Sequence, residues 1–254
     1  AVNVQGEVQK KLDVVANDIF LSRGAASGVL AAMVSEELDE IELVAGAGNA
    51  RHALVFDPLD GSSNLEINGA VGSIFSVLDL GKSSEISAVD VLQPGKKQVA
   101  AGYALYGPAT MLVLTTGQTV TVFSLDEASA EFVMVRDKVE IPAEAAEFAI
   151  NASRQTRWYA PTRAFIDACI AGKSGPFGKS YNMRWCAAMV ADLHRILYRG
   201  GVFLYPEDED TRGKGGRLRL LYEANPMSMI IEAAGGASST GTERLLDIEP
   251  SSLH

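Results

Sequence analysis

Two aspartates three residues apart, Asp57 and Asp60, are the side chains in this sequence that are best placed to do chemistry. They lie in the run Asp-Pro-Leu-Asp-Gly-Ser-Ser, which follows the apolar residues 53–56. Pro58 fixes the backbone between the two carboxylates, and Asp60-Gly61 is typical of a turn. Carboxylates held this close repel each other unless a cation lies between them, and Mg²⁺ prefers oxygen ligands. The run therefore predicts a divalent-metal site at the end of a strand.

The residues after the two aspartates could bind a phosphate group. Ser62 and Ser63 can cap a following helix, and the N–H groups at the start of a helix attract an anion. A metal and a phosphate would then be neighbours. The alternative is an ordinary acidic turn with a capping serine. Glu36 and Glu37 follow the apolar stretch 29–34, but taken singly they are typical of surface acids.

The composition excludes several classes of function. The 254 residues carry a formal net charge of −10, whereas nucleic acid and anionic lipid attract basic surfaces. No apolar run approaches the length of about 20 residues that spans a bilayer, and the first residues lack the features of a secretory signal. We therefore expect a cytoplasmic protein with neither nucleic acid nor membrane as a partner. Cys169 and Cys186 are too few for a disulfide framework, and both are expected in the core.

The first part of the chain is expected to be a helix followed by a sheet. Leu12, Val15 and Ile19 recur at helical spacing, so this apolar face should cover the sheet while Asp13 lies on the opposite, polar face. Apolar and β-branched residues then predict strands, with a hairpin turn at 116–118. These strands are 53–56, 72–80, 99–106, 111–115, 120–125 and 132–136.

After Pro142 the pattern changes to strands that alternate with longer helices, which is typical of an α/β unit. The expected elements are a strand ending at Asn151, helices near 162–171 and 186–199, and a strand at 202–205. Asn225-Pro226 is a candidate helix start, with Asn225 as the N-cap. The acidic run 207–210 before a glycine-rich stretch predicts a mobile loop. We place the domain boundary between residues 1–141 and 142–254.

The motifs together resemble one family, the class I fructose-1,6-bisphosphatases of the lithium-sensitive, magnesium-dependent phosphatase group. The resemblance covers nearly the whole chain. Besides residues 57–64, it rests on Lys-Lys-Leu-Asp at 10–13, Ser-Glu-Glu at 35–37, Leu-Gln-Pro-Gly at 92–95, Ala-Ala-Gly-Tyr-Ala-Leu-Tyr-Gly at 100–107, Met-Val-Ala-Asp-Leu-His-Arg at 189–195, Leu-Arg-Leu-Leu-Tyr-Glu at 218–223 and Asn-Pro-Met at 225–227. It implies a layered α-β-α-β-α sandwich, with an N-terminal mixed-sheet domain and a C-terminal α/β domain.

The resemblance also implies the reaction, which is hydrolysis of the 1-phosphate of fructose 1,6-bisphosphate by magnesium-activated water. Two or more Mg²⁺, or Mn²⁺ in their place, would assist as in other metal-dependent phosphoryl transfer. Glu37 and Asp13 would orient and deprotonate the water, and Glu7 stands where the family often has aspartate. The implied metal ligands are Glu36, Glu37, Asp57, Asp60, Glu223 and the carbonyl of Leu59.

The implied substrate contacts fall into two groups, one at each end of the sugar. The 1-phosphate would lie against Asp60, Gly61, Ser62 and Ser63. The 6-phosphate and sugar would contact Asn151, Tyr205, Met189, Arg217, Arg219 and Arg184, the last from a neighbouring subunit of a homotetramer. Three residues depart from the family pattern: Trp185 replaces a common tyrosine, Arg217 a common lysine, and Arg154 a phosphate-binding tyrosine of some members.

Three other functions are compatible with parts of this pattern. Sedoheptulose-1,7-bisphosphatase activity, alone or in addition, is one, because both substrates present the same 1-phosphate end. An inositol-monophosphatase-like enzyme shares the Asp-Pro-Leu-Asp-Gly signature but leaves residues 10–13 and 218–223 unexplained. An inactive phosphosugar-binding protein should have lost an acid of the cluster, and none is missing.

The resemblance also concerns regulation by AMP, which inhibits many of the related enzymes at a site remote from the metals. There the nucleotide contacts a sheet edge that bears a lysine, a tyrosine and an arginine. The matching positions here are Arg51, His52 and Asp79. Because Asp79 replaces a phosphate-binding cation with an anion, we expect a weak response to AMP or none.

Overall fold

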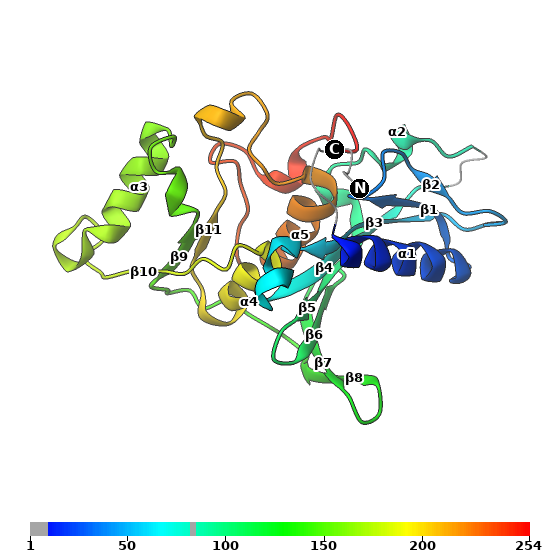
Figure 1. The fold of residues 1–254 in the computed structure, drawn as a ribbon. Coiled ribbons are helices and arrows are strands. Elements are labelled where there is room, and N and C mark those ends of the chain that lie inside the picture. The colour runs from blue at the N-terminus through cyan, green and yellow to red at the C-terminus, as the bar shows by residue number, and fades with distance from the viewer. Residues whose placement is uncertain (1–9, 82–84) are drawn as a thin grey trace.

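A large mixed sheet forms the first half of the protein (Figure 1). The computed structural model describes residues 10–81 and 85–254. The sheet has eight strands in the order β2-β1-β3-β4-β5-β6-β7-β8, and β1 and β3 are the parallel pair. Its strands are β1 Leu30–Ser35, β2 Glu42–Leu43, β3 His52–Asp60, β4 Val71–Asp79, β5 Gln98–Tyr106, β6 Thr110–Thr115, β7 Val120–Asp126 and β8 Glu131–Arg136.

The six strands expected in this half are confirmed, and so is the hairpin between β6 and β7, which pair antiparallel with Thr115 opposite Val120. The apolar stretch that forms β1 was not among the expected strands. All six residues of β1 are buried, so it lacks the alternation that marks a half-exposed strand. A continuous apolar run of that length is ambiguous between helix and strand.

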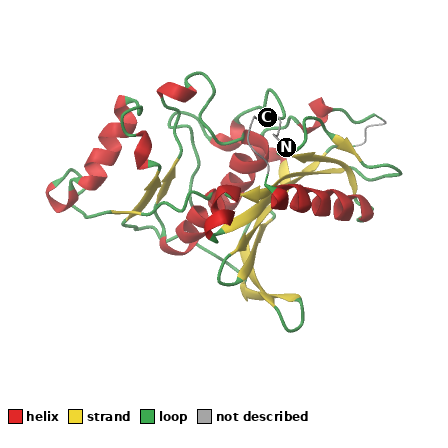
Figure 2. Ribbon diagram, in the orientation of Figure 1, coloured by secondary structure: helices red, strands yellow, loops and turns green. Residues whose placement is uncertain are grey.

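A smaller parallel sheet forms the second half, in the order β10-β9-β11 (Figure 2). Its strands are β9 Glu147–Ile150, β10 Asn182–Met183 and β11 Val202–Leu204. Helix α3, Ala160–Ile170, packs on this sheet through Ile166 and Cys169. Alternation of strands and helices after residue 142 is therefore confirmed.

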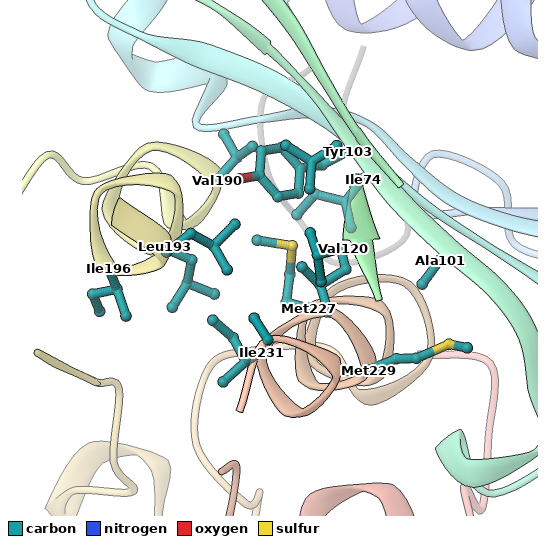
Figure 3. Close-up of a cluster of buried hydrophobic side chains, with 14 of the residues drawn as sticks. Ile74, Ala101, Tyr103, Val120, Val190, Leu193, Ile196, Met227, Met229 and Ile231 are labelled. Atoms are coloured by element: carbon teal, nitrogen blue, oxygen red, sulfur yellow. The ribbon is translucent and has the colours of Figure 1, made fainter. Parts of the chain in front are cut away.

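Two helices lie between the sheets, α4 Met189–Arg199 and α5 Asn225–Ala233 (Figure 1). The main core forms where they meet strands β4 and β5. Figure 3 shows Val190 and Leu193 of α4 facing Met227 of α5 beneath Tyr103 and Ile74. Helix α1, Lys11–Ala26, covers the other face of the large sheet, and α3 the outer face of the small one. This mixed α+β arrangement confirms the predicted fold class.

The remaining helical segments are short. They are α2 Ala88–Val91, the 3-10 helices Ser62–Ile67, Gly95–Lys97, Ala152–Arg154, Gly172–Ser174, Glu209–Thr211 and Leu245–Asp247, and a π-helix at Leu220–Ala224 that runs directly into α5. Among the described residues, none of the helices is both long and apolar enough to cross a membrane.

Helix α1 covers the sheet as expected, but with the opposite face. Leu12, Val15 and Ile19 are 53%, 49% and 55% exposed, whereas Asp13 and Asn17 are buried. The buried face makes specific contacts that a pattern of hydrophobic residues does not predict. Asn17 accepts a hydrogen bond from the Ser35 hydroxyl, at 2.6 Å, and further along this face Phe20 stacks on Phe56.

Glycine explains why the same face lies so close to the sheet. A Cβ at Gly24 would lie 2.5 Å from the sulfur of Met33, so glycine permits this approach without a shift of the Met33 side chain. The face of α1 that packs on the sheet is therefore its polar face, and the apolar face is exposed.

Two smaller expectations are wrong. Cys186 is exposed rather than in the core, because it lies in the loop before α4, which begins only at Met189. Asn225 does not cap α5, because the preceding π-helix continues through it without a break and gives it helical backbone angles. Cys169 is buried as predicted.

Candidate active site

Three carboxylates far apart in the sequence meet at one place in the structure. Oxygen atoms of Asp57, Asp60 and Glu223 all lie within 4.8 Å of one another, and all three residues are buried. Asp57 and Asp60 belong to the end of β3, and Glu223 to the π-helix that runs into α5. The metal site expected at the end of this strand therefore has a matching set of oxygen donors.

Strand β3 presents its two aspartates together because its pairing with β4 is interrupted. The register shifts between Asp57 and Asp60. Within this bulge the Asp57 carboxylate accepts a hydrogen bond from Leu59 N at 2.8 Å, and the Pro58 carbonyl accepts one from the Ser73 hydroxyl at 2.8 Å. A bulge re-aims side chains in this way, so both carboxylates point to one side.

Burial and repulsion from neighbouring acids raise the pKa values of the carboxylates in this cluster. Burial raises the pKa of Asp57 well above its usual value, and repulsion from Glu36, Asp60 and Glu223 raises it further. Burial and repulsion from Glu36 likewise raise the pKa of Glu223, while Arg219 opposes the rise. Burial raises the pKa of Asp60 to about 6, against hydrogen bonds from the backbone of Val190 and Met189. A divalent cation would remove this penalty, so these residues fit a magnesium site.

Glu36 adjoins the cluster, and Glu37 lies outside the three-carboxylate group. Glu36 follows β1, where its N–H group donates to Phe56 O at 3.1 Å, and its side chain is hydrogen-bonded to Asp57. Arg219 Nη2 lies 3.7 Å from Glu36 Oε1. Glu37 is half-buried, and its N–H group donates to the Ser35 hydroxyl.

The structure says less about Asp13 and Glu7, the two other acids expected to act on the attacking water. Asp13 is buried and accepts a hydrogen bond from Lys10 N at 2.6 Å, which closes the first turn of α1. Its role toward a water molecule stays a prediction. Glu7 lies outside the described residues.

The residues expected at the 1-phosphate form a tight turn directly after the cluster. Gly61 has φ of 76°, and a Cβ there would collide with Ala188, so glycine is required twice over. Ser62 and Ser63 begin a 3-10 helix, but neither side chain caps it, because Gly61 occupies the N-cap position. The first N–H groups of such a turn have no partner within the helix.

Several residues expected at the far phosphate pack against Tyr205 or act on its pKa. Burial raises the pKa of Tyr205, while Arg217, Arg219 and Arg154 lower it through their charge. Trp185 packs edge-on against Tyr205, with ring centroids 5.7 Å apart. Glu223 also acts on the Tyr205 pKa, so the aromatic group lies within electrostatic range of the metal cluster.

The predicted substrate residues differ in how exposed they are to solvent. Arg184 and Arg217 are exposed, Asn151 is half-buried and bonded to Ser153, and Met189 is packed into the core at the start of α4. Met189 can therefore contribute to the site mainly through its backbone.

Arg154 is held by the acidic loop that was expected to be mobile. Its Nε atom lies 2.8 Å from Asp208 Oδ2, and a second nitrogen pairs with Asp210. Asp208 itself caps the 3-10 helix Glu209–Thr211. The expectation of a mobile loop overlooked this arginine, which is 54 residues away in sequence from Asp208.

Three residues that hold the loop before α4 were not expected to have this role. Asn64 Nδ2 donates to Cys186 O at 2.9 Å, Asp192 Oδ2 accepts from Cys186 N at 3.0 Å, and Arg195 contacts Asp192. Asn64, Asp192 and Arg195 all lay within recognised motifs. Only their partner, a loop backbone distant from Asn64 in sequence, could not be predicted.

Comparison with known proteins identifies the architecture. Residues 1–137 match the family model described as fructose-1-6-bisphosphatase, N-terminal domain, and residues 141–254 match that of the C-terminal domain. The chain belongs to the fructose-1,6-bisphosphatase family. It is a phosphoric monoester hydrolase that acts on fructose 1,6-bisphosphate.

Solved structures agree with this assignment. The crystal structure of Leishmania major fructose-1,6-bisphosphatase in holo form is 36% identical and superimposes with a TM-score of 0.94, covering 100% of this chain and 78% of that one. The apo form of the same enzyme is also 36% identical, with a TM-score of 0.89 over 96% of this chain and 78% of that chain.

Proposed function

We propose that this fructose-1,6-bisphosphatase removes the 1-phosphate with the help of Mg²⁺ held by Asp57, Asp60 and Glu223. The observation that carries the proposal is the convergence of three buried carboxylates whose pKa values are raised by burial and, for Asp57 and Glu223, also by the charges of Glu36 and Asp60. When bound, the cation supplies charge that lowers the pKa of a water molecule and neutralises the leaving oxygen. Glu36, Glu37 and the Leu59 carbonyl complete the proposed ligand set, with two or more ions per subunit, and Mn²⁺ can substitute.

The remaining acids would act on the water molecule. Glu37 is half-buried beside the cluster and is positioned through its N–H bond to Ser35. We assign it the task of accepting the proton of the attacking water, with Asp13 and Glu7 as further acids implied by the family. A general base of this kind must lie within hydrogen-bond reach of the proton that it accepts.

The chain's own residues would orient the sugar by its two phosphates. The backbone of Gly61, Ser62 and Ser63 would hold the 1-phosphate next to the carboxylates, since Gly61 follows Asp60 directly. Tyr205, Trp185 and Asn151, with Arg217 and Arg219, would hold the other end. Holding both ends fixes the reacting phosphorus relative to the water, which is the main source of catalysis in phosphoryl transfer.

We further propose a homotetramer in which Arg184 reaches the substrate of a neighbouring subunit. The exposure of Arg184 supports this assignment, because a side chain that is 54% exposed is available to a partner. A cytoplasmic location stays a prediction of the sequence.

Activity on sedoheptulose 1,7-bisphosphate is the second candidate. It rests on Arg217, one of the arginines whose charge lowers the pKa of Tyr205, because this residue is exposed. A longer sugar would place its second phosphate farther from the carboxylates, and long cationic side chains can follow it.

Hydrolysis by the purified protein decides between these proposals. Phosphate release is measured from fructose 1,6-bisphosphate, sedoheptulose 1,7-bisphosphate and inositol phosphate, with Mg²⁺ or with a chelator. We expect the fructose substrate to be hydrolysed and chelation to abolish turnover. Asp60→Asn should lose at least about a thousandfold in kcat, and Asp167→Asn, the same change on the exposed face of α3, should lose nothing. Near-full activity of Asp60→Asn with Mg²⁺ would refute the metal assignment.

A further inference from the structure

The loop between β10 and α4 connects the two ends of the proposed substrate cleft. At its start it carries Trp185, which packs edge-on against Tyr205 of the far-phosphate group. At its end Ala188 packs against Gly61, and Val190 N donates to Asp60 Oδ2 at 2.8 Å. Its position therefore sets the separation between the far group and the metal turn.

This loop has no regular secondary structure of its own to hold it. Ala187 has φ of 57°, in the left-handed region that residues other than glycine rarely adopt and that costs of the order of a kilocalorie. A strained conformation persists only when the surroundings fix it. The groups that fix the loop conformation therefore help to set the shape of the proposed substrate cleft.

Side chains hold the loop at its backbone. Cys186 N donates to Asp192 Oδ2 at 3.0 Å, Cys186 O accepts from Asn64 Nδ2 at 2.9 Å, and Arg184 O accepts from Arg195 Nη2 at 3.4 Å. Asn64 belongs to the phosphate turn, whereas the other two come from α4. The loop is thereby attached to the metal end on one side and to the helix on the other.

Asp192 is the central member of this network. It is completely buried, and Arg195 Nη2 lies 3.3 Å from its Oδ1 atom. Arg195 in turn contacts Glu147 at 2.7 Å, at the start of β9. A buried charge is tolerated only when it is paired, and here the pairing also orients the oxygen that holds Cys186.

We propose that Asp192 is a positioning residue that fixes the spacing between the two phosphate sites, and hence the preference for a sugar with phosphates at both ends. It touches neither substrate nor metal, and it acts through the backbone of Cys186 and through Arg195. The proposal rests on the proposed function, since it assigns the far phosphate to the group that contains Tyr205 and Trp185.

The test compares two substrates that differ only at the far end, fructose 1,6-bisphosphate and fructose 1-phosphate. In Asp192→Asn the amide keeps the shape but loses the charge that Arg195 compensates. We expect kcat/KM for the bisphosphate to fall about tenfold or more, mostly through KM, because hydrogen bonds to charged groups are worth about that factor. The monophosphate should change less than about threefold. Asp167→Asn is the matched control.

A second measurement reports on the loop without catalysis. In a Trp158→Phe background, acrylamide quenching of Trp185 fluorescence should increase in Asp192→Asn and stay unchanged in Asp167→Asn. If Asp192→Asn does not fold, Arg195→Lys takes its place, because lysine keeps the charge but lacks the two-armed fork. The same direction with a smaller loss is then expected.

The outcomes separate this inference from the function on which it rests. Equal losses on both substrates, or no loss with unchanged quenching, would each overturn the positioning role. If the unaltered protein does not hydrolyse the bisphosphate at all, the proposed function fails, while quenching still decides whether Asp192 holds the loop.

Discussion

Two groups of buried acids in this protein are neutralised in opposite ways. Asp57, Asp60 and Glu223 face one another, and burial dominates the rise of all three pKa values. Glu147 and Asp192 are also buried, and burial raises the pKa of Asp192 too, but Arg195 opposes that rise and lies between them, 2.7 Å from Glu147 and 3.3 Å from Asp192. The two groups therefore differ in the source of their neutralising positive charge. In the second group it is an arginine side chain, whereas the first group needs a cation from solution.

The largest effect should come from removing an acid of the first group. Asp57→Asn should reduce kcat by at least about a thousandfold, because a lost ligand disables metal-assisted hydrolysis. In the metal-free protein the same change should raise the melting temperature, since it removes repulsion and a buried charge. Calorimetry in chelator and phosphate release with Mg²⁺ measure the two effects. A lower melting temperature would contradict the view that this cluster is uncompensated.

The second group should behave in the reverse way. Glu147→Gln breaks the buried pair with Arg195 and leaves Asp192 as the remaining carboxylate partner of that arginine, which costs about 3 kcal/mol. Urea unfolding in chelator measures the loss. The half-activating Mg²⁺ concentration should stay unchanged, and a shift in it would show that the two groups are not separate.

Added Mg²⁺ should change the thermal stability of the variants in the two groups differently. A ligand that binds only the folded protein stabilises it by RT ln(1 + [L]/Kd), which is about 2.7 kcal/mol at a hundred times Kd. We therefore expect Mg²⁺ to raise the melting temperature of the unaltered protein and of Glu147→Gln by similar amounts, and to have no effect on Asp57→Asn. Ca²⁺ at equal concentration controls for charge alone.

The pH dependence of the metal-free protein should reflect the first group. The folded pKa of Asp60 is raised from 3.8 to about 6, so its carboxyl group stabilises the folded state below pH 3.8 relative to higher pH. Stability is lost as pH rises from 3.8 to 6, by about 3 kcal/mol for Asp60 alone. Denaturant unfolding in chelator at pH 4.5 and 7 should show this loss relative to Asp60→Asn. Saturating Mg²⁺ should abolish the difference.

The smallest effect is expected at an exposed ion pair. Arg51 Nη2 lies 3.2 Å from Asp79 Oδ2 across the β3–β4 pairing, where the family resemblance places AMP-binding cations. A surface pair of this kind contributes 1 kcal/mol or less to stability, so Asp79→Arg should leave activity unchanged. We expect no inhibition of the unaltered protein by micromolar AMP and a gain of inhibition in Asp79→Arg. Inhibition of the unaltered protein would remove Asp79 as the cause.

The contrast between the two acid groups also marks what the sequence can predict. Asp57 and Asp60 were predictable because a rigid three-residue spacing after a strand is local information. Glu223 and Glu36 entered through the family resemblance alone, since nothing local distinguishes them from surface acids. The pairing of Arg195 with Glu147 joins residues 48 apart in sequence, and no spacing rule gives such a partner.

Helix α1 gives the same lesson for the fold. Hydrophobic periodicity correctly predicted a helix against the sheet, and it failed to predict which face is buried. The buried face carries Asn17 and Gly24, whose contributions are a hydrogen bond and a close approach to Ser35 and Met33. Both depend on the shape of the facing strand, which the helix sequence does not encode.

The π-helix that carries Glu223 has a consequence for natural and engineered variation. It continues without interruption into α5, whose Met227 and Ile230 are among the most buried side chains of the core. The position of a proposed ligand is thus set by apolar packing one turn away. In a mutational scan, substitutions of Met227 or Ile230 that the fold tolerates should still score as loss of activity, and addition of Mg²⁺ should restore part of it.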